Sequence, residues 1–249
     1  MLEHLLELVR QRRLSAALPF AVEAWSSRPH AEFAELVAAL AKLCEAPRGK
    51  VPSRAELLAE PQAIWLDELL TWVASSRNSP AMMRNLQALV EAWPEDPRIV
   101  DWIISFLGQP AWDLSGGNPR DLAEVMVQIL AASRDERVEA FARELPAFFE
   151  AHKGSRKGEL SRDEIACLDE LFSAAGLLPG YGRQPPQRAS TLSAEELAMV
   201  EALRAELRTI EAKGEHGGAA KEQLLKAVID DWGSDEAKQV YADFLLEQG

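Results

Sequence analysis

Four histidines and two cysteines are the side chains of this sequence best suited to metal binding or nucleophilic catalysis. Cys44 and Cys167 each lie among apolar residues at helical spacing, and neither belongs to a Cys-x-x-Cys pair. No histidine lies one helical turn from another histidine or from a cysteine; the four are His4, His30, His152 and His216. This distribution predicts two buried thiols and neither a metal site nor a cofactor.

No short motif of a known catalytic geometry occurs, whether a Gly-x-Ser-x-Gly elbow, a His-Glu-x-x-His pair or a phosphate-binding Gly-x-x-x-x-Gly-Lys loop. Neighbouring carboxylates such as Glu195 and Glu196 could act as acid and base, but acidic residues are also typical of helix starts and solvated surfaces. An enzyme with carboxylates assembled from several helices remains an alternative, because sequence spacing does not reveal a pair formed by the fold.

Two segments contain the residue types of a ligand site. The loop from Trp112 to Arg120 leads into a predicted helix start, where free amides could hold an anion, although a simple turn is the competing interpretation. The acidic turn from Asp230 to Glu236 lacks the glycine and glutamate spacing of a calcium loop. Ser234 as a helix cap, followed by acidic residues in the first turn, explains this segment without a metal.

Tryptophans beside loops are candidate anchors for a protein partner. Trp112 and Trp232 adjoin predicted loops, whereas the other five lie on apolar helical stripes, and burial in the core is the alternative for both. The candidate partner-binding residues combine these tryptophans with the charges beside them: Trp112, Arg120, Asp230, Asp231, Trp232 and Asp235.

Helical periodicity runs through nearly the whole sequence, and the alternation typical of strands is scarce. A serine followed three residues later by a glutamate, the pattern of a capping box, occurs at Ser53–Glu56, Ser133–Glu136, Ser161–Glu164 and Ser193–Glu196. Asn118-Pro119 marks a further helix start, with proline at the first helical position. The predicted fold class is all-α.

Short junctions at Trp25–Pro29, Ala74–Asn78 and Ala131–Asp135 predict antiparallel helix pairs. Their spacing of roughly 50 to 60 residues indicates degenerate repeats. The pattern is similar to HEAT-like helical repeats and predicts a short α-solenoid, with an irregular helical domain as the alternative. Asp96-Pro97-Arg98 and Asp135-Glu136-Arg137, which each open a predicted helix, agree with this resemblance.

Charge excludes one class of partner. The 27 basic and 40 acidic residues give a net charge of −13, which repels a nucleic-acid backbone. No apolar run approaches the roughly 18 uncharged residues of a membrane helix. Met1–Arg10 contains acidic residues and predicts an amphipathic helix rather than a signal peptide, so no membrane partner and a cytoplasmic location are expected.

Prolines and glycines gather between Gly176 and Arg188, and they predict a domain boundary. The expected organisation is a helical-repeat domain over 1–176, a linker over 177–192 and an acidic helical module over 193–249. Within this module, a break is expected at Lys213–Gly218, followed by a helix pair over 219–231 and 234–248. From Leu192 onward the chain has 13 acidic and six basic residues, a net charge of −7.

The segment from Glu222 to Gly249 resembles the bacterial repeat-companion domain, a module often found beside repeat proteins. The similarity rests on Leu224, Leu225, Val228, Val240, Tyr241, Ala242, Asp243, Leu245 and Glu247, whereas Phe244 stands where the family usually has tryptophan. The resemblance implies an attachment module without a settled biochemical role. It also leaves open that the chain is the docking part of a longer repeat protein.

Abundant helix pairing without catalytic motifs predicts a non-enzymatic scaffold or adaptor that binds a protein through its helical-repeat surface. Neither the identity of the partner nor the oligomeric state follows from the sequence.

Overall fold

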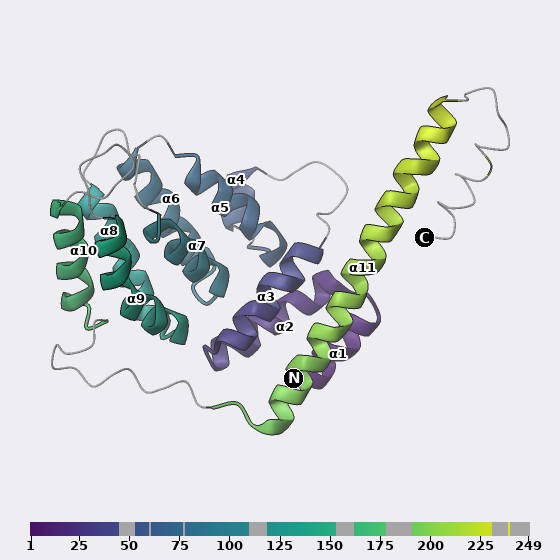
Figure 1. Cartoon of the computed structure of the whole chain (residues 1–249), viewed down its shortest axis with the longest axis horizontal. Coiled ribbons are helices and arrows are strands. Elements are labelled where there is room, and N and C mark those ends of the chain that lie inside the picture. The colour runs from purple at the N-terminus through teal and green to yellow at the C-terminus, as the bar shows by residue number, and fades with distance from the viewer. Residues whose placement is uncertain are drawn as a thin grey trace. The chain divides into compact units, whose positions relative to one another are not determined.

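The computed structural model describes residues 1–44, 53–59, 61–76, 78–109, 119–152, 162–177, 191–230 and 239. Within these ranges the regular structure is helical and contains no strand, which confirms the predicted all-α class (Figure 1). The chain divides into two compact units, Met1–Val200 and Glu201–Gly249. Most of the linker predicted over 177–192 lies outside the described residues.

Three N-terminal helices pack in chain order: α1 (Leu2–Arg10), α2 (Leu14–Ser27) and α3 (Ala31–Leu43). The first of them is amphipathic, as predicted, and it buries four aliphatic side chains: Leu5, Leu6, Leu8 and Val9. The turn into α2 passes through Arg12, whose φ of 56° lies in the left-handed region. The amides of Arg12 and Arg13 donate to the carbonyls of Val9 and Leu8, so the last turn of α1 is capped by backbone.

The following helices form two layers. One layer consists of a 3₁₀ turn and three helices: η1 (Ala63–Trp65), α5 (Leu66–Ala74), α7 (Pro97–Leu107) and α9 (Glu136–His152). The other layer consists of α6 (Ser79–Ala92), α8 (Pro119–Ser133) and α10 (Arg162–Ala174). Helices that follow each other within a layer are in contact, and α5 and α7 also pack on α6 and α8 of the opposite layer. The short α4 (Arg54–Ala59) packs on α6.

The N-terminal helices adjoin the first layer, because α2 contacts η1 and α3 contacts α7. Phe33, Leu36 and Leu40 of α3 are at most 1% exposed, as are Ile103 and Leu107 of α7. Burying such a side chain contributes about 1.5–3 kcal/mol relative to leaving it in water. One apolar core therefore runs through the first compact unit.

Polar side chains define where several helices begin, as two of the predicted capping boxes show. Ser53 Oγ accepts from the amide of Glu56 at 3.4 Å, and the Glu56 carboxylate accepts from the amide of Ser53 at 2.7 Å. The same reciprocal pair joins Ser193 and Glu196, at 3.2 and 2.9 Å. Helix α8 begins at Pro119, as predicted. Ser161 of a third predicted box lies outside the described residues.

The capping box predicted at Ser133–Glu136 is wrong. Ser133 is the last residue of α8, and its hydroxyl donates back to the Leu130 carbonyl at 2.8 Å. The side chain that caps α9 is Asp135, whose Oδ1 accepts from the amide of Arg137 at 2.9 Å. Glu136 is engaged elsewhere, because its Oε1 accepts from the amide of Ala31, at the start of α3, at 2.7 Å. A charged cap and a tertiary contact thus replace the local pattern.

The helix break predicted at Lys213–Gly218 is also wrong. Helix α11 runs without interruption from Ala194 to Asp230 and carries the boundary between the two compact units. A glycine inside a helix costs about 1 kcal/mol relative to alanine but removes no backbone hydrogen bond, unlike proline. Most of the second helix expected in the C-terminal pair, over 234–248, lies outside the described residues.

Glu196 carries a second contact besides its capping box, an ion pair with Arg28 at the end of α2. The hydrogen bond from Arg28 and those from Ser193 lower the pKa of Glu196 to about 2. A lowered carboxyl pKa stabilises the fold above the ordinary glutamate value of about 4.5, and this stabilisation is lost as the pH falls through about 2.

Glu196→Gln is therefore expected to lower the free energy of unfolding near neutral pH, and its difference from the wild type should shrink as the pH falls toward about 2. Urea unfolding at several pH values measures this. Glu56→Gln is the matched control, because Glu56 closes the same type of capping box without an arginine partner among the described residues. A difference between wild type and Glu196→Gln that stays constant with pH would contradict the expectation.

Candidate functional site: a groove between α6 and α8

A buried arginine fixes the start of α7. The side chain of Arg98 is 4% exposed, and its Nε and Nη2 donate to the two oxygens of Asp96 at 3.0 and 2.8 Å. Its Nη1 donates to Asp67 Oδ2 at 3.0 Å, and Nη2 donates also to the Ala63 carbonyl at 2.7 Å. Burial opposes the charge of Arg98, but the hydrogen bonds and charges of the two aspartates leave its pKa above the ordinary value. Arg98 therefore joins α7 to η1 and α5.

The same arrangement recurs one helix pair later. Arg137 donates through Nε and Nη2 to Asp135, at 3.0 and 2.5 Å. Its Nη1 forms an ion pair with Asp101, and its Nη2 donates to the Pro97 carbonyl at 3.3 Å. In both cases the arginine contacts two groups that lie four residues apart in the preceding part of the first layer. Arg98 reaches the Ala63 carbonyl and Asp67, and Arg137 reaches the Pro97 carbonyl and Asp101. Asp-x-Arg is thus a repeated link between successive helices of the first layer.

These clusters contain several carboxylates, as the alternative of an enzyme requires, but arginines occupy them. Burial raises the pKa of Asp101, while the charge of Arg137 opposes this shift. Both oxygens of Asp96 accept from Arg98, and both oxygens of Asp135 accept from Arg137. The geometry assigns the four aspartates of the two clusters to joining helices: Asp67, Asp96, Asp101 and Asp135.

The end of α2 is attached to the turn between α6 and α7. The hydroxyl of Ser26 donates to the carboxylate of Glu95 in that turn. The neighbouring Trp25 is 3% exposed, and its indole Nε1 has no hydrogen-bond acceptor within the described part of the chain. Trp93, which ends α6, is 7% exposed. Two nearly buried tryptophans therefore come together at the junction of α2 with the paired helices.

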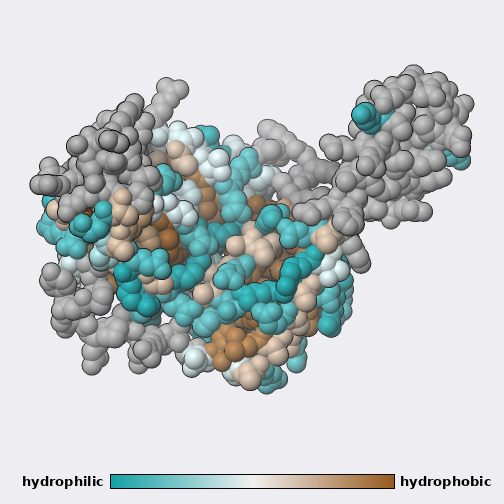
Figure 2. Space-filling model, in the orientation of Figure 1, coloured by the Kyte–Doolittle hydropathy of each residue, from teal (hydrophilic) through white to brown (hydrophobic). Residues whose placement is uncertain are grey.

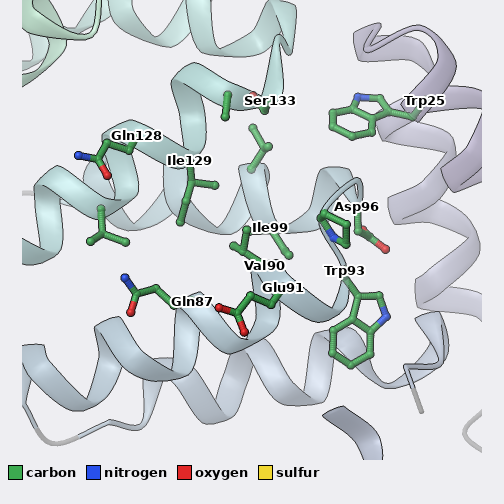
Figure 3. A pocket seen from close by; sticks show the side chains of 14 residues that line it. Trp25, Gln87, Val90, Glu91, Trp93, Asp96, Ile99, Gln128, Ile129 and Ser133 are labelled. Carbon is green, nitrogen blue, oxygen red and sulfur yellow. The ribbon is translucent and has the colours of Figure 1, made fainter. Parts of the chain in front are cut away.

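A half-open groove begins at this junction and runs between α6 and α8. Its volume is about 490 Å³. Ile99 and Val100 of α7 contribute to its lining, together with Val90 of α6 and two residues of α8, Val125 and Ile129 (Figure 3). Trp25 and Trp93 line it at the end near α2. The groove has the size and the mostly apolar lining of a binding site.

The polar residues of the groove carry no positive charge. Gln87 and Glu91 lie on the α6 side and Gln128 on the α8 side, and all three are exposed (Figure 3). Asp96 also lines the groove, but Arg98 binds both of its oxygens. Among the described residues, no hydrogen bond or ion pair engages the carboxylate of Glu91, and no lysine, arginine or histidine lines the groove. The groove is therefore apolar with an acidic rim.

Among the candidate residues predicted from the sequence, only Arg120 has a described side chain, and it does not line this groove. Arg120 lies at the start of α8, where its Nη2 forms an ion pair with Glu170 of α10 at 3.0 Å, and both side chains are exposed. Asp230 is the last residue of α11, and its side chain is outside the description. The remaining candidates lie outside the described residues: Trp112, Asp231, Trp232 and Asp235.

Sequence patterns hardly indicate the groove, because four separate helices and a turn contribute to it. Trp25 and Trp93 lie on apolar stripes and were expected in the core, which their burial confirms. Their additional place in the groove depends on how α2 meets the turn after α6. The one local signal is the outward position of Gln87 and Glu91, four residues apart on α6, beside Val90.

No family model, curated protein or solved structure matches this chain.

The described ranges contain no group of three or more acidic, histidine or cysteine side chains placed to hold a metal ion. They also contain no helix long and apolar enough to span a membrane. On the coloured part of the face shown in Figure 2, hydrophobic residues form small patches among hydrophilic ones.

Proposed function

We propose that this protein is a non-enzymatic helical adaptor that binds a segment of a protein partner in the groove between α6 and α8. The observation that carries the proposal is the groove itself, which combines an apolar lining with the exposed carboxylate of Glu91, unpaired within the described part of the chain. A binding surface needs apolar area for affinity and a few polar groups for specificity. The residues of the groove supply both.

The helix pairs are proposed to be a short HEAT-like α-solenoid. The order of contacts within each layer supports this, since successive helices adjoin each other. The repeated links from Arg98 and Arg137 to the preceding helix support it further. In such architectures each repeat packs mainly on its neighbours, and the surfaces that remain are used for recognition.

Two further proposals concern the C-terminal segment and the location of the protein. The resemblance of Glu222–Gly249 to the repeat-companion domain suggests a C-terminal attachment module beside the repeats. A cytoplasmic location agrees with two unpaired cysteines, Cys44 and Cys167, since disulfides are rare in that compartment.

Partner capture with two charge-matched variants tests the proposal. Ile129→Glu places a carboxylate in the groove, and Ala131→Glu places one on an exposed position of the same helix outside its lining. Proteins that bind the groove should be retained by wild type and Ala131→Glu, and their yield should fall at least about tenfold with Ile129→Glu, because the partner's apolar side chains would meet a charge. Circular dichroism checks that both variants are folded.

Equal retention by both variants would refute binding in the groove. Turnover of a substrate that depends on Glu91 would favour the enzyme alternative instead.

A further inference from the structure

We propose that the segment bound in the groove is an amphipathic helix whose apolar face enters between α6 and α8 and whose flanking lysine or arginine lies beside Glu91. This inference rests on the proposed function and specifies the chemistry of its partner. It follows from three features of the groove: its apolar depth, its lack of backbone partners and its charge.

The apolar depth requires several aliphatic or aromatic side chains from one ligand. Ile99 and Val100 are 3% exposed, whereas Val90, Val125 and Ile129 remain partly accessible. Covering such side chains contributes roughly 25 cal/mol for each Å² of apolar surface removed from water. A helix presents apolar residues at spacings of three and four along one face, which matches an elongated groove between two helices.

The lack of backbone partners favours a helix over an extended peptide. Apart from the turn between α6 and α7, the groove is lined by helices, whose interior amides and carbonyls are engaged within the helices, and no strand edge exists among the described residues. An extended peptide would have to bury free amides and carbonyls against aliphatic side chains, at a cost of about 1–3 kcal/mol for each unsatisfied group. A helical segment satisfies these groups internally.

The charge of the groove selects the flank of that helix. Glu91 is exposed and unpaired within the described chain, and no basic residue lines the groove. Arg98 cannot serve an acidic ligand, because Asp96, Asp67 and Ala63 already accept from its guanidinium group. The whole chain has a net charge of −13. A basic flank is therefore attracted, and an acidic flank is repelled.

Fluorescence anisotropy with two synthetic helical peptides tests the inference on the full chain. One peptide has leucines at spacings of three and four with lysines on both flanks, and the other has glutamate in place of every lysine. The wild-type protein is expected to bind the basic peptide at least about tenfold more tightly. Glu91→Lys should weaken the basic peptide about fivefold or more, whereas Glu144→Lys, on an exposed position of α9, should change it less than about twofold.

A general attraction of a basic peptide to an acidic protein predicts a different pattern. Under that explanation Ile129→Glu and Ala131→Glu would both strengthen binding of the basic peptide, because each adds a negative charge. Insertion into the groove predicts the opposite sign for Ile129→Glu, a loss of about tenfold or more. If Ile129→Glu does not fold, Ile129→Ala should still weaken binding, through lost apolar contact.

The outcomes separate this inference from the proposed function. Equal effects of Glu91→Lys and Glu144→Lys, or equal binding of the two peptides, would overturn the basic helix as the occupant. If Ile129→Glu abolishes binding of both peptides, this result would then still support a groove that binds proteins. Conversely, specific peptide binding together with partner capture that does not depend on Ile129 would refute the adaptor proposal.

Discussion

Arg98→Ala is expected to lower the free energy of unfolding by about 3–5 kcal/mol, because it leaves the buried carboxylate of Asp96 without its counter-charge. The side chain of Asp96 is 1% exposed, and both of its oxygens lose the guanidinium donors. The Ala63 carbonyl and Asp67 lose a donor as well, so the contact between α7 and the η1–α5 segment is weakened. Urea or guanidinium unfolding monitored by circular dichroism measures the loss.

Two controls make this result interpretable. Arg84→Ala removes the same side chain from an exposed position of α6 and should change stability by no more than about 0.5 kcal/mol. Asp96→Asn combined with Arg98→Met removes both charges and should cost less than Arg98→Ala alone, because no buried charge is left unpaired. A loss below about 1 kcal/mol for Arg98→Ala would show that the Asp-x-Arg link is not a major source of stability.

Phe172→Ala is expected to cost about 3–5 kcal/mol through the cavity that it leaves. The ring of Phe172 is fully buried on α10 and lies edge-to-face with Phe141 of α9, with 6.0 Å between the ring centroids. Because α10 also packs on α8, removing the ring should loosen the last helix of the second layer. Thermal and chemical unfolding give the size of the loss.

The matched control for this prediction lies on the same helix. Asp169 is exposed, and Asp169→Ala should stay within about 0.5 kcal/mol of the wild type. Phe172→Leu should give an intermediate loss, since it keeps most of the apolar volume. A cost for Phe172→Ala no larger than that of Asp169→Ala would mean that α10 adds little to the cooperative core.

Local signals in the sequence were sufficient for the fold class and for several helix starts. Capping boxes such as Ser53–Glu56 and Ser193–Glu196 involve residues within one turn, so their chemistry is complete in the sequence. The failure at Ser133 has a long-range cause, because Glu136 binds the start of α3, more than a hundred residues earlier. At Ser133–Glu136 the distant partner takes the carboxylate that the local pattern assigns to the cap, whereas Glu196 serves both its cap and Arg28.

The groove and the arginine links depend on packing, and sequence reasoning reached them only in part. The letters of Asp96-Pro97-Arg98 and Asp135-Glu136-Arg137 indicate similar helix starts, but they do not reveal the acceptors of the two arginines on the preceding elements. Those acceptors include backbone carbonyls of Ala63 and Pro97, which no residue type can reveal. The groove requires in addition the angle at which α6 and α8 diverge, which follows from tertiary packing alone.

The Asp-x-Arg links have a direction. In each link the arginine lies later in the chain, and its long-range acceptors lie in the preceding helix of the same layer. Arg98 is therefore left without part of its hydrogen bonding until η1 and α5 are in place. During synthesis the amino-terminal end of a chain emerges first. Each acceptor is thus available before the arginine that needs it, which favours sequential folding from the N-terminus through α9.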